Sequence, residues 1–143
     1  GGDAAAGHLT SAPYFMVHES AENEKFVSAY KKRWGSNRVT HFVSEPAYFG
    51  VKLFKQAVEK IGKAGDINPT AIMEACKGQE IMAPQGKIKI DPENLHCYLW
   101  PKIGICKSNG QYNIIRKTNT WVKPLPYAAY PDQTCKEGGL VKA

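Results

Sequence analysis

Residues 44–61 read SEPAYFGVKLFKQAVEKI and carry the clearest fold signal in the chain. Five apolar residues recur there at the spacing of one helix face: Ala47, Val51, Phe54, Val58 and Ile61. Ser44 as a cap, Glu45 as a first-turn acid and Pro46 in the first turn are typical of a helix start. The pattern predicts an amphipathic helix whose apolar stripe faces a core.

Two further helices are predicted on either side of this stretch. Ser20 is an N-cap residue, acids follow it in the first turn, and Gly35 ends the apolar periodicity, which predicts a helix of about four turns between them. Asn68-Pro69 is a helix start as well, and it predicts a shorter helix through Cys76.

The remaining patterned segments are typical of β-strands. Residues 7–16 read as an extended segment and residues 38–43 as a short strand. Lys87–Ile90 alternates polar and apolar residues. Asn109-Gly110 is a strong hairpin turn signal because both residues tolerate positive φ, so we expect 102–106 and 112–117 to pair. Three prolines after residue 123 predict an extended tail.

Composition limits the class of protein. The 143 residues are 43% apolar and 22% charged, which is enough for one packed domain. The uncharged stretch 4–18 is broken by two histidines and a proline and is shorter than the roughly 20 apolar residues of a membrane span. The net charge is +6, but the longest basic run is the triplet 31–33, so nucleic-acid binding is not indicated.

No pattern for covalent chemistry, a cofactor or a metal is present in the sequence. A phosphate-binding loop needs glycines between a strand and a helix and a Lys-Ser/Thr ending, which Gly62-Lys63-Ala64-Gly65 lacks. Four histidines lie outside any nucleophile or Cys-His signature: His8, His18, His41 and His96. We therefore expect a protein that is not an enzyme.

The four cysteines leave two alternatives open. Cys76, Cys97, Cys106 and Cys135 are widely spaced and contain no C-x-x-C pair. Two disulfides would suit an oxidising compartment, and free buried thiols fit the count equally. If a disulfide forms, we expect a pair from the three C-terminal cysteines.

Several short segments, in this order and spacing, resemble one family. They are 7–15, 22–34, 38–40, 45–60, Ala83-Pro84-Gln85-Gly86, Asp91-Pro92-Glu93-Asn94, and 122–124 with 126–127. Together the chain resembles the C-terminal portion of type I periplasmic solute-binding proteins, in the branch that binds urea and short-chain amides. The resemblance covers residues 7–131, so residues 1–6 and 132–143 are expected to be flexible ends.

The resemblance implies an α/β fold of two lobes joined by crossover strands, here as three helices, a β-hairpin and an extended tail. It implies that the segment 7–15 is one crossover and that the helix beginning at Glu45 borders the ligand cleft. Tyr48 is then expected to contact the ligand, and Glu45 to accept hydrogen bonds from amide N–H groups. The alternatives for these two are a packing aromatic and a first-turn acid that complements the helix dipole.

The function implied by the resemblance is that of the solute-binding component of an ABC importer in the periplasm. Its partners would be a small polar solute (urea, a short-chain amide or a small amino acid), an ABC permease and the remaining N-terminal portion of the same protein. The alternative is an amide-sensing regulatory protein of the same fold that acts through a protein partner. Neither function involves chemistry on the solute.

Overall fold

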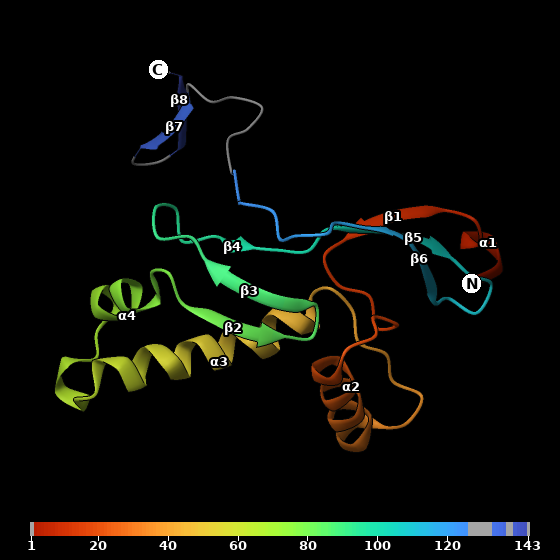
Figure 1. Cartoon of the computed structure of the whole chain (residues 1–143), viewed down its shortest axis with the longest axis horizontal. Coiled ribbons are helices and arrows are strands. Elements are labelled where there is room, and N and C mark those ends of the chain that lie inside the picture. Colours follow the sequence, from red (N-terminus) through yellow and green to blue (C-terminus); the bar gives the residue numbers. More distant parts are fainter. Residues whose placement is uncertain (1, 126–132, 137–138, 143) are drawn as a thin grey trace.

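The computed structural model describes residues 2–125, 133–136 and 139–142, and combines helices with small antiparallel sheets (Figure 1). In chain order the elements are α1 (Gly2–Ala5), β1 (Leu9–Ala12), α2 (Ala21–Trp34), α3 (Ser44–Ile61), a 3-10 turn (Ala64–Asp66), α4 (Pro69–Cys76), β2 (Glu80–Ala83), β3 (Gly86–Ile90), β4 (Cys97–Tyr98), β5 (Lys102–Cys106), β6 (Tyr112–Lys117), β7 (Gln133–Lys136) and β8 (Gly139–Lys142). This arrangement agrees with the α/β class expected from the sequence.

Local capping signals explain two of the helices. The Ser20 side chain accepts a hydrogen bond from the backbone N–H of Asn23 at the start of α2, and Gly35 ends that helix with φ 117°. The Asn68 side chain accepts from the backbone N–H of Ala71 at the start of α4. Both caps satisfy donors that the first helical turn leaves free, so both helices begin where the sequence predicts.

The predicted apolar stripe of α3 is on the wrong face. The buried residues are Glu45, Phe49, Leu53 and Ala57, whereas Val51 is 71% exposed and Phe54 55% exposed. Ser44 does not cap the helix either, because the N-cap residue is Val43 and the Ser44 hydroxyl bonds with the backbone of His41. Packing against β2 determines which face of α3 is buried. Glu45, the polar residue at the start of that face, has its hydrogen-bond partners inside the protein.

The predicted strand at residues 38–43 is also wrong. The segment is a turn that leads into α3, since the backbone N–H groups of Ser44 and Glu45 both bond to the His41 carbonyl. The Thr40 hydroxyl bonds with the Tyr14 hydroxyl at 2.7 Å. Side-chain and turn contacts take up the polar groups here, so no strand partner is needed.

One sheet joins the N-terminal strand to a hairpin much later in the chain. Its order is β1-β5-β6, with Leu9 opposite Ile105 and Ala12 opposite Lys102, so the first strand pairs with one about 90 residues later. β5 and β6 form the hairpin predicted from Asn109-Gly110. A Cβ on Gly104 would lie 2.9 Å from the Phe15 ring, so a larger residue would push that ring away.

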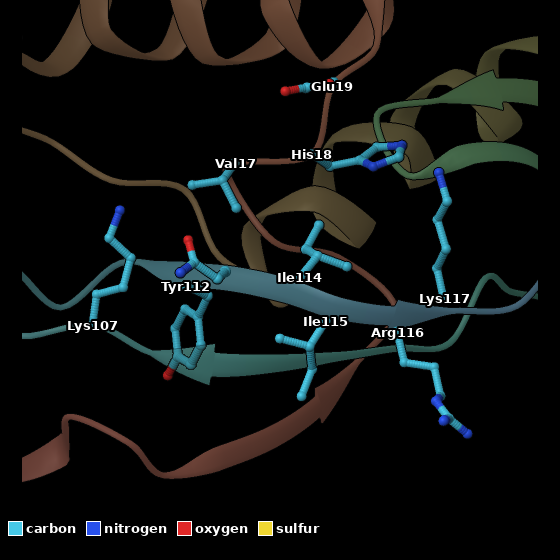
Figure 2. Close-up of a pocket in the computed structure, with 10 residues that line it drawn as sticks. Val17, His18, Glu19, Lys107, Tyr112, Ile114, Ile115, Arg116 and Lys117 are labelled. Carbon is cyan, nitrogen blue, oxygen red and sulfur yellow. The ribbon is translucent and has the colours of Figure 1, made fainter.

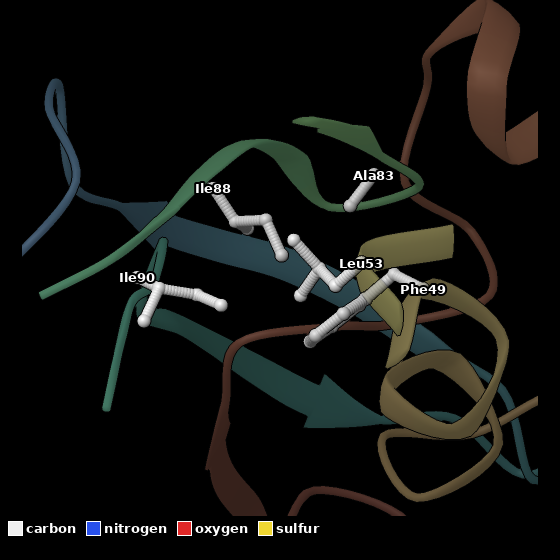
Figure 3. Packing of buried hydrophobic residues seen from close by; sticks show 5 residues of the cluster. All are labelled: Phe49, Leu53, Ala83, Ile88 and Ile90. Atoms are coloured by element: carbon white, nitrogen blue, oxygen red, sulfur yellow. The ribbon is translucent and has the colours of Figure 1, made fainter. Parts of the chain in front are cut away.

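The second sheet has the order β2-β3-β4 and packs on α3. Figure 3 shows the apolar side chains of this core directed toward one another: Phe49, Leu53, Ala83, Ile88 and Ile90. β4 leads directly into β5, so the chain passes from this sheet into the first one (Figure 1). The two sheets are therefore linked through residues 99–101.

The chain ends and the cysteines add three observations. α1 occupies residues 2–5, and β7 pairs with β8, while part of the expected tail, residues 126–132, lies outside the described residues. Cys76, Cys97 and Cys106 are free thiols, and the side chain of Cys135 is outside the described part. No helix in the described residues is long and apolar enough to span a membrane.

The core assignment predicts a contrast between two neighbours on α3. Leu53→Ala should lower the free energy of unfolding by about 2–5 kcal/mol, because it empties a buried position. Phe54→Ala should cost about 1 kcal/mol or less, because that ring is already mostly in solvent. Urea unfolding followed by circular dichroism measures both values, and an equal or reversed cost would contradict the assignment.

Candidate functional site

A fully buried carboxylate lies at the start of α3. Glu45 has 0% exposure, and its two carboxylate oxygens accept hydrogen bonds from the backbone N–H and the side-chain amide of Gln85, at 3.3 and 2.9 Å. Gln85 occupies the turn between β2 and β3. Glu45 therefore holds this turn against the first turn of the helix.

A buried lysine meets the same turn from the other sheet. Lys102, at the start of β5, is 2% exposed. Its ammonium donates to the backbone carbonyls of Pro13, Trp100 and Gln85 at 2.7, 3.0 and 3.4 Å. One side chain thus ties the segment after β1, the start of β5 and the β2–β3 turn together.

Burial shifts the titration of both groups toward neutral pH. Loss of hydration raises the pKa of Glu45 to about 7, although the hydrogen bonds from Gln85 and the charge of Lys102 oppose the rise. Burial likewise lowers the pKa of Lys102 to about 8, against the opposite effect of Glu45. The junction of the two sheets is therefore sensitive to pH near neutrality.

A separate polar cluster holds the segment between β1 and α2. The Tyr14 hydroxyl donates to the Asn23 side-chain oxygen at 2.8 Å, and burial raises the pKa of Tyr14 to about 12. The Asn23 amide donates to the backbone carbonyls of Met16 and His18 at 2.8 and 2.6 Å. These hydrogen bonds fix the position of the backbone at His18.

Two cavities open beside this segment. The larger, of about 690 Å³, lies between residues 17–19 and β6 (Figure 2), and its lining is Val17, His18, Glu19, Lys107, Tyr112, Asn113, Ile114, Ile115, Arg116 and Lys117. The smaller, of about 300 Å³, is lined by His18, Gln85, Gly86, Trp100, Lys102, Lys117, Thr118 and Asn119. His18 and Lys117 line both cavities.

The electrostatics at the shared wall are positive. Burial lowers the pKa of His18, and the charges of Lys102 and Lys117 lower it further, while Glu19 has the opposite and smaller effect. In the described part of the chain, no group of three or more His, Cys, Asp or Glu side chains could hold a metal ion. The arrangement is suited to noncovalent binding of a solute that carries negative charge.

The two residues expected to contact a ligand are not among the residues that line the two cavities. Tyr48 is half-buried, its ring is 4.6 Å from that of Phe26, and the Lys52 ammonium is 4.3 Å from its centre. Tyr48 and Glu45 line neither cavity, although Glu45 is bonded to Gln85, which lines the smaller one. Their contact with a ligand stays a prediction.

The cavity-lining residues were not predicted from the sequence. They come from separate segments near residues 18, 85, 100 and 117, which only the tertiary fold brings together. The one local signal was that β6 ends in two consecutive cations, Arg116 and Lys117. Nothing local indicates that His18 faces them.

The family described as "Periplasmic binding protein domain" matches residues 1–133. The chain belongs to this family. A Leu/Ile/Val-binding protein homolog 6 from Brucella abortus is 37% identical over 95 residues, which are 66% of this chain and 24% of that protein. A protein named limonene hydroxylase from Geobacillus stearothermophilus is 28% identical over 130 residues, but these cover 22% of it, so its named activity does not transfer.

Solved structures of solute-binding proteins of ABC transporters share the fold. One from Rhodopseudomonas palustris BisB5, in complex with 3,4-dihydroxybenzoic acid, is 34% identical, with a TM-score of 0.73 over 85% of this chain and 33% of that chain. One from Rhodopseudomonas palustris HaA2, in complex with p-hydroxybenzoic acid, is 30% identical, with a TM-score of 0.63 over 81% of this chain and 31% of that one. The chain therefore spans about a third of these relatives or less.

The buried carboxylate predicts an unusual pH dependence of stability. The pKa of Glu45 is raised from 4.5 to about 7, so the folded state holds this proton more tightly than the unfolded chain. Its stabilising contribution is complete below pH 4.5 and is lost as the pH rises to 7. A rise of this size corresponds to about 3 kcal/mol as an upper value.

Glu45→Gln removes the titrating group and should abolish this loss. We expect urea unfolding to show that, as the pH rises from 4.5 to 8, the free energy of unfolding of the wild type falls relative to that of Glu45→Gln. The control is Glu24→Gln, which removes an exposed carboxylate from α2 and should keep the wild-type pH dependence. Parallel curves for wild type and Glu45→Gln would contradict the prediction.

Proposed function

We propose that this chain forms the C-terminal part of the solute-binding component of an ABC importer that works in the periplasm. The observation that supports this most strongly is the family match over residues 1–133 together with the fold shared with ABC solute-binding proteins. The β1-β5-β6 sheet also fits the proposal, because it ties the segment 9–12 to the later hairpin as a crossover between lobes would. Binding, not chemistry, is the activity we assign.

We propose a small carboxylate as the solute. The relatives named above bind 3,4-dihydroxybenzoic acid and p-hydroxybenzoic acid, or carry the name of a protein for branched-chain amino acids, and all these compounds share a carboxylate. The wall at His18 and Lys117, which the charges of Lys102 and Lys117 make positive, is compatible with that group. A small amino acid belongs to this class, while urea and short-chain amides are neutral and form the competing class.

The predicted site residues keep separate proposed roles. Glu45 is a positioning residue, because it acts on the smaller cavity only through Gln85. Tyr48 is a proposed ligand contact on α3, where its half-buried ring lies next to Phe26 and Lys52. Both proposals place the N-terminal half of α3 next to the solute.

The partners we propose are an ABC permease and the part of the family's fold that this chain does not include. The exposed apolar side of α3, with Val51 and Phe54, is suited to the second contact, because contiguous apolar surface marks a protein interface. A regulatory protein that senses amides would use the same lobes, and preference for a neutral amide would favour it.

A chimaera tests the proposal. This chain would replace the corresponding third of the Rhodopseudomonas palustris BisB5 protein, and calorimetry would measure binding of 3,4-dihydroxybenzoate, leucine, urea and acetamide. We expect a carboxylate to bind with a Kd within about tenfold of that of the unmodified relative, a difference of about 1.4 kcal/mol. A folded chimaera that binds none of the four would contradict the proposal, and preference for urea or acetamide would identify the amide branch.

A further inference from the structure

The smaller cavity brings an imidazole and an ammonium together from distant parts of the chain. His18 precedes α2 and Lys117 ends β6, and Figure 2 shows the Lys117 ammonium directed toward the His18 ring. Among the residues that line this cavity in the described part of the chain, none carries a carboxylate. The wall is therefore positive without a counter-charge inside the cavity.

Two other polar side chains that line the cavity, those of Lys102 and Gln85, are already engaged. Lys102 donates to three backbone carbonyls. Gln85 donates its amide to Glu45 and accepts from the Trp100 backbone N–H at 3.3 Å. The Lys102 charge still contributes through space, so direct contact with a bound solute is left to the other lining residues, with His18 and Lys117 among them.

A buried hydroxyl supplies an independent sign of a ligand. The Thr118 hydroxyl oxygen is buried and has no hydrogen-bond partner within the described structure, and Thr118 lines the cavity. A buried polar group without a partner is costly, and a bound acceptor would satisfy it. Thr118 and Lys117 both line the cavity.

Trp100 gives the cavity an apolar side. Its indole N–H donates to the Lys87 carbonyl at 2.6 Å, so the only donor of the ring is already used. An ammonium, an imidazole, a hydroxyl and an aromatic ring in one cavity suit a compact organic acid. The volume of about 300 Å³ lies at the lower end of the usual range for ligand sites.

We propose that the cavity between His18 and Lys117 binds the carboxylate of a small organic acid, with the Thr118 hydroxyl as a third donor and Trp100 against the body of the acid. Protonated His18 and the Lys117 ammonium each donate a charge-assisted hydrogen bond to the carboxylate. The choice of an organic acid over a free inorganic anion rests on the proposed function.

The test follows the titration of His18 by NMR in the 143-residue chain, with the other histidine resonances as internal references. Benzoate is the probe, and sodium sulfate at equal ionic strength is the arm for a free inorganic anion. A carboxylate beside the imidazolium favours its charged form, so benzoate should raise the pKa of His18 by about 1 at saturation. Sulfate should leave it unchanged.

Two variants and a control separate binding from structure. Lys117→Met should raise the pKa of His18 without ligand, since a nearby positive charge is removed, and should reduce the further rise with benzoate by at least half. Thr118→Val keeps the side-chain shape and should weaken benzoate binding severalfold. Lys63→Met removes the same charge from a loop outside both cavities and should match wild type.

Three results would overturn the inference. They are an unchanged pKa of His18 in saturating benzoate, an equal rise with sulfate, and an unaltered benzoate response in both Lys117→Met and Thr118→Val. Failure here is distinct from failure of the importer proposal, because the chimaera can bind its carboxylate while His18 does not respond. In that case the solute binds elsewhere in the cleft.

Discussion

The structure depends on the buried contact between Glu45 and Gln85. A carboxylate with 0% exposure is costly unless donors replace its water, and Gln85 supplies two from one residue. The backbone carbonyl of Gln85 accepts a hydrogen bond from the Lys102 ammonium, which also donates to the Pro13 carbonyl. α3, the β2–β3 turn and the β1-β5-β6 sheet are therefore joined at one point. The apolar core between α3 and strands β2 and β3 lies beside this point (Figure 3).

The cavity next to this junction follows from the register of the β1-β5-β6 sheet. Lys102 pairs with Lys117 across β5 and β6, so the buried and the exposed lysine leave the sheet at the same level. His18 reaches that level because the Asn23 amide holds its backbone carbonyl. A slip of one residue in β6 would turn Lys117 to the opposite side of the sheet and remove the cationic wall.

Local signals account for what the sequence predicted well. The Ser20 and Asn68 caps and the Asn109-Gly110 hairpin depend on neighbours in the chain, and they are confirmed. The face of α3 and the strand at 38–43 were wrong, because the compensating partner of Glu45 lies 40 residues away and the partner of Thr40 lies 26 away. The cavities combine segments still further apart, so periodicity and spacing cannot show them.

The charges at this junction couple ligand binding to proton uptake. A carboxylate held by His18 and Lys117 places negative charge near Glu45, whose pKa is about 7, and beside His18, whose pKa burial and two lysines lower. Negative charge favours the protonated form of both groups, so binding takes up protons and weakens as the pH rises through this range. By reciprocity, protonation of Glu45 favours the bound state. The residue that joins the two sheets would then also adjust the affinity of the cavity without touching the ligand.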